Sequence, residues 1–331
     1  CHLVTLPPCP LVPLSPCAVE PLPRFCHTGR MAYRTKHIVE YGFLRGATAL
    51  MQVLPLRGAL ALGWVLAALM YPFVAKRAAE ARRRMRSVLG PDVPERDLRR
   101  WAWTSWRNIF FNVVEIARAP RWTRAEVDRL VDYTEVGKLL ERQRTRGGFT
   151  MAVCHMGNWE LAGFTVRLLG LPLFVMMRGQ SNPLVTAYLN RIREAAGVGA
   201  IERHSKALGQ IAKRIRAGEV FTILPDIRAK SPDGAVRVPF LGGEAYLNAG
   251  TCLFARHTET PVITAYVRRV GWTRHQIVVH DPIFPDPSLD KHDDIARMLT
   301  IIMARFDAEI RRDPGQYFWY NKRWVLDPSF G

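Results

Sequence analysis

At 331 residues the chain is long enough to bury a sizeable hydrophobic core, as one large α/β domain or two small ones. Its formal net charge of +18 suits nucleic acid, an anionic membrane or an acidic protein equally well, so charge alone does not choose among these partners. The sequence has no glycine-rich phosphate loop, zinc pattern or recognition-helix signature, which argues against nucleic-acid binding.

Residues 1–30 differ in composition from the rest of the chain. They contain seven prolines, which are incompatible with a helix or a central strand, and four of the six cysteines. The cysteine spacings fit no zinc pattern, and the basic and apolar regions of a cleavable signal peptide are missing. We expect this segment to lie outside the fold, with Met31 as the true start. The other two cysteines, Cys154 and Cys252, stand in apolar surroundings typical of reduced, buried thiols.

Residues 31–86 are predicted to anchor the protein to a membrane. Within them, residues 58–75 form a stretch of 18 residues without a charge, near the lower limit of length for a membrane span, and Pro72 marks its end. Residues 76–86 follow directly and carry six basic side chains, a pattern typical of the cytosolic side of an anchor that also attracts anionic lipid headgroups. We expect a spanning or in-plane helix, and a buried core helix is the alternative.

Residues 87–331 are predicted to form one α/β domain. An amphipathic helical region at 97–140 comes first, and strands and helices then alternate, which implies a sheet flanked by helices. The expected strands are 149–154, 171–177, 220–224, 236–240, 262–267 and 276–280, and the expected helices are 182–196, 206–217, 245–257 and 293–312. Residues at strand ends converge on one crevice in such sheets, and His155, Arg178 and Asp226 each hold such a position.

The most informative stretch is residues 149–163, FTMAVCHMGNWELAG. An apolar strand ends at His155, a Gly-Asn pair forms a turn, Asn158 is a suitable helix N-cap, and Glu160 falls in the first helical turn. On one continuous helix His155 and Glu160 would point about 140° apart. Across a strand–turn–helix junction they can meet, so that the carboxylate accepts from one imidazole nitrogen and leaves the other as a base. A structural histidine beside an apolar strand is the alternative.

Four segments, in this order, resemble the lipid A biosynthesis lauroyl and myristoyl acyltransferases, which belong to the glycerolipid acyltransferase superfamily. The segments are HMGNWELAG (155–163), RGQSNP (178–183), LPDIR with GAVRVPFLGGEA (224–228 and 234–245) and YFWYNKRW (317–324). The resemblance covers roughly residues 31–324, and four ordered segments are far more specific than any one of them.

This resemblance implies a membrane-associated acyltransferase on a glycerolipid acyltransferase-like mixed α/β sheet. His155 would be the general base and Glu160 its partner in a catalytic dyad, with no metal or cofactor. Arg178 would bind a phosphate or the developing oxyanion, or orient Glu160, and Asn158, Asp226 and Arg228 complete the expected substrate-binding residues. For Arg178 a structural ion pair, and for Asp226 a plain Pro-Asp turn, are the alternatives.

The resemblance also implies partners and a location. The donor would be an acyl-carrier-protein or coenzyme A thioester, and the acceptor would be a glycolipid of the lipid A precursor type. The enzyme would be located at the cytoplasmic face of the cell inner membrane. A phosphatidylinositol mannoside or a lysophospholipid is the alternative acceptor, and a non-catalytic basic membrane scaffold the alternative from another class. The chain departs from the family at Ile227, usually Gln, and at Asn321, often His. The first departure argues against a direct polar role for that loop, and the second restricts residues 317–324 to structure or headgroup contact.

Two other enzyme classes fit the sequence less well. A cysteine enzyme would need Cys154 and His155 to act together, but neighbouring side chains in a strand point to opposite faces. A metal hydrolase built on His155, Glu160 and Asp226 would lack a second histidine at a ligand-like spacing.

Overall fold

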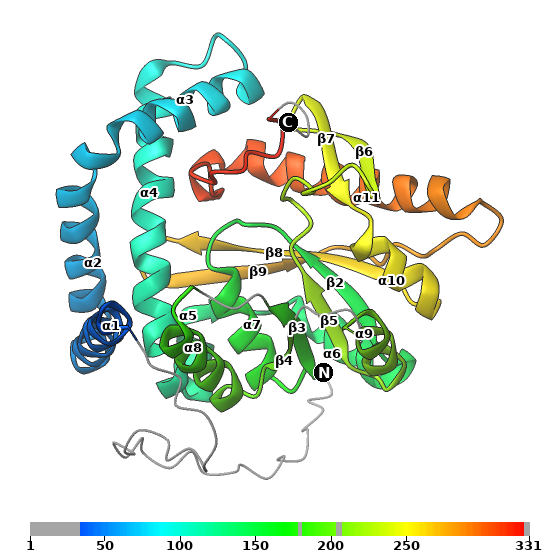
Figure 1. The fold of residues 1–331 in the computed structure, drawn as a ribbon, viewed down its shortest axis with the longest axis horizontal. Helices are drawn as coiled ribbons and strands as arrows, with labels where there is room; N and C mark the ends of the chain where they lie inside the picture. Colours follow the sequence, from blue (N-terminus) through cyan, green and yellow to red (C-terminus); the bar gives the residue numbers. More distant parts are fainter. Residues whose placement is uncertain (1–33, 178–180, 203–206, 328–331) are drawn as a thin grey trace, which may run out of the picture.

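A seven-stranded mixed sheet forms the centre of the molecule in the computed structural model, which describes residues 34–177, 181–202 and 207–327. Its order is β1-β9-β8-β2-β5-β3-β4, with β8, β2, β5, β3 and β4 all parallel and β9 antiparallel to β8. The strands are β1 (Val131–Asp132), β2 (Phe149–Val153), β3 (Leu173–Met177), β4 (Gly199–Glu202), β5 (Val220–Ile223), β8 (Val262–Val270) and β9 (Arg274–Val279). The predicted mixed α/β sheet flanked by helices is confirmed (Figure 1).

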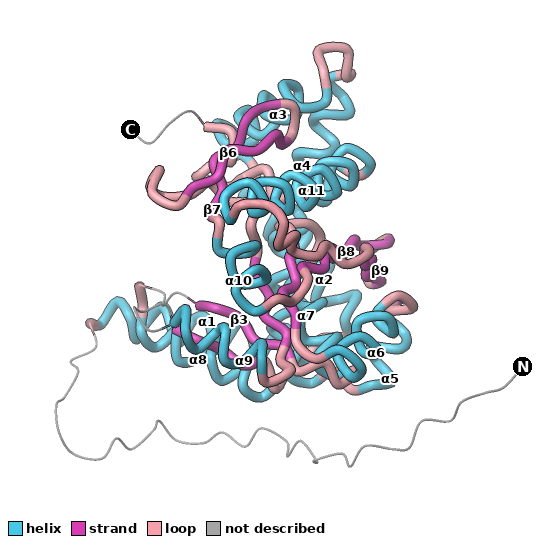
Figure 2. Tube along the Cα trace, turned by 90° about the vertical axis from the view of Figure 1, so that its right-hand side faces the viewer, coloured by secondary structure: helices cyan, strands magenta, loops and turns pink. Residues whose placement is uncertain are grey.

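Helices cover both faces of this sheet (Figures 1 and 2). They are α1 (Thr35–Val53), α2 (Leu56–Met70), α3 (Ala75–Leu89), α4 (Glu95–Arg118), α5 (Arg124–Leu130), α6 (Val136–Arg146), α7 (Trp159–Leu168), α8 (Pro183–Ala195), α9 (Ala207–Arg216), α10 (Gly250–Thr258) and α11 (Lys291–Arg312). Successive side chains of β2 point to opposite faces of the sheet, so they join the helix layers on its two sides. Met151 and Val153 join a core with α5, α6 and α7, whereas Ala152 and Cys154 join a core with α11.

A small hairpin lies beside α11, formed by β6 (Ala235–Phe240) and β7 (Gly243–Asn248). Its two turn residues, Leu241 and Gly242, both have positive φ, 52° and 78°, which suits a tight turn between antiparallel strands. The predicted strand at 236–240 is confirmed. The predicted helix at 245–257 is wrong at its start, because residues 243–248 return as β7 and the helix begins only at Gly250.

The helical region predicted at 97–140 is divided in the structure. The helix α4 ends at Arg118, and a 3₁₀ turn containing Pro120 follows, since proline cannot continue the helix. Thr123 and Glu126 then form a capping box that starts α5, and β1 and α6 complete the region. The short strand β4 was not predicted, because its four residues carry no clear alternation.

The uncharged stretch at 58–75 does not form one helix. The helix α2 ends at Met70, Pro72 starts a 3₁₀ turn, and α3 begins at Ala75. No single helix among residues 34–177, 181–202 and 207–327 is long and apolar enough to cross a membrane, and α2 with the following segment Pro72–Leu89 passes that test only as a pair bent by 53°. The helices of residues 34–89 pack onto the rest of the molecule, α1 and α2 against α4 and α3 against α4 and the C-terminal segment.

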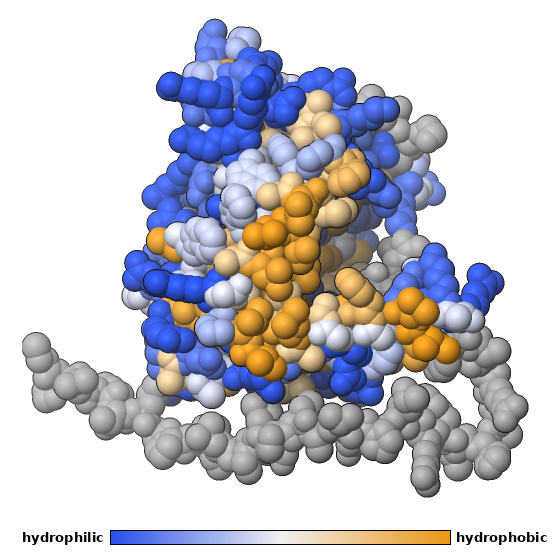
Figure 3. Space-filling view, turned by 90° about the vertical axis from the view of Figure 1, so that its left-hand side faces the viewer, coloured by the Kyte–Doolittle hydropathy of each residue, from blue (hydrophilic) through white to orange (hydrophobic). Residues whose placement is uncertain are grey.

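The helix α2 has two apolar faces with different surroundings. Its residues Ala59, Leu60, Gly63 and Ala67 are buried, and Gly63 lies directly against Val114 of α4. Its other face, together with α1 and the turn at Phe73, exposes large apolar side chains that we call the apolar stripe (Figure 3). The apolar stripe consists of Ile38, Val39, Phe43, Leu50, Val53, Trp64, Val65, Leu66, Leu69, Met70 and Phe73.

The basic residues of α3 are largely engaged within the protein. Arg82 and Arg86 contact Glu95, and Arg83 contacts Glu80. Arg84 is mostly buried and donates to the carbonyls of Trp319 and Asn321, at 2.9 and 2.8 Å, while its guanidinium lies over the Trp324 ring. Of the six basic side chains expected to face a membrane, three therefore bind other parts of the fold, Arg83 pairs within its own helix, and Lys76 and Arg77 are exposed.

Candidate active site

The site lies at the carboxyl ends of two neighbouring parallel strands, β2 and β5. These strands are paired with Ala152 opposite Ile223, so the residues that follow them leave the sheet side by side. His155 follows β2 and Asp226 follows β5, which places both in one crevice. The prediction that His155 and Asp226 converge there is confirmed. Arg178 and residues 1–30 lie outside the described residues.

His155 and Asp226 form a two-point contact. The imidazole Nδ1 lies 2.8 Å from Asp226 Oδ1, and the backbone N–H of His155 donates to Oδ2 at 2.9 Å. Because a carboxylate accepts hydrogen bonds and does not donate them, Nδ1 carries the proton and Nε2 is left as the free acceptor. The Asp226 side chain is 0% exposed, whereas the His155 side chain is 16% exposed and lines a cavity.

Glu160 does not hold the His155 imidazole at Nδ1. Its carboxylate accepts from Arg193 of α8 at 3.1 Å. The sequence reasoning placed the carboxylate correctly, in the first turn of α7 and facing the same cavity as His155. It missed that Asp226, supplied by the neighbouring strand, already occupies Nδ1. Asp226, expected to bind substrate, is therefore the residue that orients the histidine.

The other predicted binding residues separate into two groups. Asn158 is buried and does not line the cavity; its Oδ1 accepts from the Leu161 N–H at 3.1 Å, so the predicted N-cap is confirmed. Arg228 does line the cavity, and the neighbouring Arg323 donates to its backbone carbonyl at 3.2 Å.

The turn after His155 requires glycine. Gly157 has φ of +60°, and a Cβ at this position would lie 2.1 Å from the carbonyl oxygen of Val267. The Gly157 N–H donates to Gln316 at 3.0 Å, and the His155 carbonyl accepts from the Phe318 N–H at 2.9 Å. The C-terminal aromatic segment therefore contacts the turn directly, in agreement with the structural one of the two roles expected for residues 317–324, structure or headgroup contact.

A cavity of about 960 Å³ opens at His155. Apolar side chains from both sides of the sheet make up much of its lining, and Trp159 lies edge-on to the imidazole at 4.9 Å between ring centroids. Four basic residues also line the cavity, namely Arg193, Arg228, Lys230 and Arg323. It therefore combines room for an apolar chain with positive charge beside a histidine whose Nε2 has no hydrogen-bond partner among the described residues.

The sequence matches a family of known proteins over most of its length. A family model described as bacterial lipid A biosynthesis acyltransferase matches residues 31–325. The chain belongs to this family of acyltransferases. It is 24% identical over 271 residues to the lipid A biosynthesis palmitoleoyltransferase of Escherichia coli K12 and to a lipid A biosynthesis acyltransferase of Shigella flexneri, alignments that cover 81% of this chain and 85% of each relative. The predicted family and the predicted acyltransferase activity are confirmed.

A cysteine nucleophile does not fit the candidate site. Cys154 is completely buried on the α11 side of the sheet. Burial, followed by the nearby charge of Asp226, raises the pKa of the Cys154 thiol well above its ordinary value, so the reactive thiolate is disfavoured. Within the described ranges, no group of three or more His, Cys, Asp or Glu side chains is placed to hold a metal ion.

Sequence reasoning missed one further residue of the candidate site, Tyr317. Its side chain is buried close to the Asp226 carboxylate, and its backbone carbonyl accepts from Ser105 at 2.6 Å. Burial, and then the charge of Asp226, raises the pKa of Tyr317 well above its ordinary value, so it stays a neutral donor. Tyr317 belongs to the recognised aromatic segment, but nothing in the sequence pairs it with Asp226.

Proposed function

We propose that this acyltransferase moves a fatty acyl chain from a thioester donor to a hydroxyl of a lipid A precursor-type glycolipid, with His155 as general base. The observation that carries the proposal is the 2.8 Å contact between His155 Nδ1 and Asp226, with the same imidazole lining a large cavity. The carboxylate holds one tautomer and stabilises the imidazolium that forms, the division of labour found in catalytic triads.

In this mechanism Nε2 of His155 removes the proton of the acceptor hydroxyl as its oxygen attacks the thioester carbonyl carbon. The tetrahedral intermediate then collapses, the carbon–sulfur bond breaks, and the imidazolium returns its proton to the departing sulfur. The products are an ester and a free thiol on the donor carrier. The acceptor hydroxyl is itself the nucleophile, so the reaction needs no acyl-enzyme.

The basic side chains in the cavity suit phosphate groups. Lipid A precursors carry phosphates, and so do coenzyme A and the prosthetic group of acyl carrier protein. Arginine binds such groups in a two-pronged geometry, which fits Arg193, Arg228 and Arg323, with Lys230 as a further charge. We assign Glu160 to holding Arg193 in the cavity, and we keep Arg178 as a binding residue on the resemblance alone.

We also propose that the apolar stripe lies in the plane of the inner membrane on its cytoplasmic face. The stripe exposes aromatic and aliphatic side chains on one side of the molecule (Figure 3). Lys76 and Arg77 lie just beyond it in α3 and would meet anionic headgroups. Such a placement would bring an enzyme with a lipid acceptor to its substrate.

The activity is tested by mass spectrometry of total lipids from cells with and without this chain, followed by assays of the purified enzyme. A fixed mass increment on a lipid A precursor is expected, and an increment on another lipid class would replace the proposed acceptor. Acyl-carrier-protein and coenzyme A thioesters offered separately identify the donor. His155→Ala should lower the transfer rate about 10²–10⁴-fold. Transfer at the parental rate by this variant would refute the mechanism.

A further inference from the structure

A carboxylate with no exposure to solvent lies beneath the active-site turn. It belongs to Glu115 of α4 and binds Arg269 through both oxygens, at 2.6 and 2.7 Å. His275 Nε2 donates to the same carboxylate at 3.0 Å, and the His275 side chain is equally buried. Burial would raise the pKa of the Glu115 carboxyl, but the charges and hydrogen bonds of His275 and Arg269 lower it to about 2, so the group is ionised.

This buried cluster is connected to the turn that follows His155. Asn158 Nδ2 donates to Glu115 Oε2 at 2.8 Å, while Asn158 Oδ1 caps α7. Arg269 donates to Asn112 Oδ1 at 3.0 Å, and Asn112 Nδ2 donates to the Gly157 carbonyl at 2.7 Å. Two residues between His155 and α7 are therefore tied to the Glu115–Arg269 pair, Asn158 through its own side chain and Gly157 through Asn112.

Gln316 connects the cluster to the same turn from the other side. Its side chain accepts from the Arg269 backbone N–H at 3.1 Å and donates to the Arg269 carbonyl at 3.0 Å. Its own carbonyl accepts from the Gly157 N–H at 3.0 Å. Hydrogen bonds thus connect Arg269 to Gly157 in two ways, through Gln316 and through Asn112. Because the turn is held from both sides, it has little freedom to shift.

We propose that the Glu115–Arg269 pair is a positioning unit that holds the turn after His155, and so keeps the imidazole aligned between Asp226 and the acceptor hydroxyl. The inference rests on the proposed role of His155 as the base. None of Glu115, Arg269, Asn158 or Gln316 lines the cavity, so the unit acts through His155 and does not touch substrate. A displacement of about 1 Å in a catalytic group can cost about 100-fold in rate.

The test compares kcat and KM for two variants with the parental enzyme, at a temperature where each is folded. Glu115→Gln removes the charge that holds Arg269, and Asn158→Ser keeps a capping hydroxyl but cannot reach Glu115. We expect kcat to fall about 10- to 100-fold in both, with KM for donor and acceptor within about twofold of the parent. Asn158→Ser alters no buried charge, so it decides the question even where Glu115→Gln does not fold.

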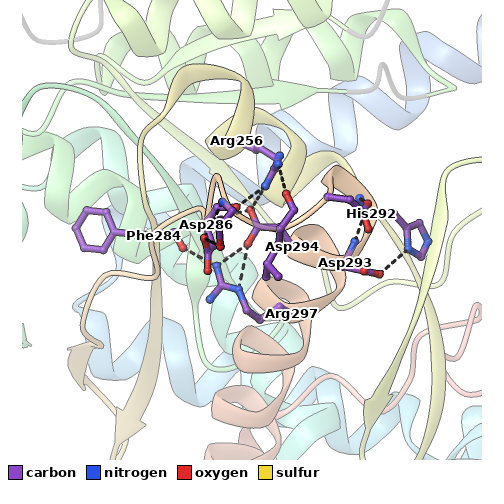
Figure 4. Close-up of polar contacts among 10 residues, drawn as sticks. Arg256, Phe284, Asp286, His292, Asp293, Asp294 and Arg297 are labelled. Carbon is purple, nitrogen blue, oxygen red and sulfur yellow. Dashed lines mark hydrogen bonds and ion pairs between the residues drawn. The ribbon is translucent and has the colours of Figure 1, made fainter.

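Asp294 provides the matched control. It is also a fully buried carboxylate between two arginines, Arg256 and Arg297, each at 2.6 Å, and none of the three lines the cavity (Figure 4). Asp294→Asn should lower the melting temperature by as much as Glu115→Gln while leaving kcat within about twofold of the parent. If kcat is unchanged in Asn158→Ser, or if Asp294→Asn loses as much kcat as Glu115→Gln, the positioning inference is wrong.

A double-mutant cycle adds a rescue. Asn158→Asp alone places a second carboxylate against Glu115, whereas Glu115→Gln with Asn158→Asp exchanges the amide and the acid and restores a donor–acceptor pair. We expect the double variant to turn over faster than the product of the two single losses predicts, and purely multiplicative losses would overturn the coupling. His155→Ala is assayed alongside. Its full activity would refute the proposed base, whereas its inactivity together with unaffected Glu115 variants would refute only the positioning role.

Discussion

His155 takes its orienting contact from Asp226, which is 71 residues away in the chain, and not from the carboxylate five residues on. The motif predicted a nearby carboxylate, and Glu160 is indeed at the cavity. The choice between the two acids depends on the pairing of β2 with β5, and strand order cannot be read from local pattern. Asn158 shows the opposite case, because its capping role follows from a local rule and was predicted from sequence.

The two acids should therefore respond differently to neutralisation. Asp226→Asn keeps the shape of the side chain but presents an amide to Nδ1, which favours the wrong imidazole tautomer, and we expect kcat to fall about 10²–10⁴-fold. Glu160→Gln should leave most of kcat and raise KM, since its partner is Arg193 in the cavity. Steady-state kinetics of both variants show which acid acts on His155. A larger loss of kcat in Glu160→Gln than in Asp226→Asn would indicate that Glu160 is the partner of His155.

Gly157 gives a second prediction at this scale. Gly157→Ala combines a positive φ with a Cβ 2.1 Å from a backbone oxygen, and we expect it to lower both the melting temperature and kcat. Gly271→Ala is the control, because Gly271 has a similar φ of +68° but nothing within 4 Å of the added Cβ. Equal effects of the two substitutions would show that backbone strain alone, and not the close approach of the turn to β8, makes glycine necessary.

Among the elements, α2 illustrates what composition can and cannot indicate. An uncharged stretch of 18 residues is equally compatible with a span, an in-plane helix and a core helix. In the structure one face of α2 is buried because α4 packs against it, and the other face is exposed. The 3₁₀ turn that begins at Pro72 separates α2 from α3. The positive charge available to a membrane at residues 76–86 was overestimated for a related reason. The sequence does not reveal that Glu95 and the C-terminal segment bind three of these arginines and that Glu80 of the same helix pairs with a fourth.

Membrane binding by the apolar stripe is tested with substitutions that leave the packed face of α2 intact. Phe43, Leu69 and Phe73 are 80%, 63% and 83% exposed, so replacing all three with Gln should leave the fold stable but weaken flotation with vesicles containing anionic lipid. Replacement of Leu168, Val270 and Phe284, which are exposed apolar residues outside the stripe, is the matched control. Equal flotation of the two triple variants would remove the stripe as the membrane contact.

For the molecule as a whole, the alternation of strands and helices predicted the sheet and most element positions. Apolar runs bounded by glycine, such as those at β2 and β5, are strong local signals. Of the hairpin β6–β7, only β6 was predicted. The strand β7 was missed because the turn at Leu241 depends on an unusual backbone conformation that sequence pattern does not reveal. The Glu115 cluster was missed entirely, since it unites α4, β8, β9 and the turn before α7 from distant parts of the chain.

That cluster makes the stability of the whole fold depend on pH in a specific window. The pKa of Glu115 is lowered from an ordinary value of 4.5 to about 2, so its ionised form favours the folded state. The stabilisation is fully present above about pH 5 and is lost as the pH falls toward 2, with a total on the order of 3 kcal/mol. The glutamine side chain of the Glu115→Gln variant has no group that titrates in this range. The difference in free energy of unfolding between parent and Glu115→Gln should therefore shrink as the pH is lowered from 5 to 2, although other carboxylates destabilise both proteins. Urea unfolding at a series of pH values measures this difference, and a difference that stays constant across the window would show that the Glu115 charge does not stabilise the fold.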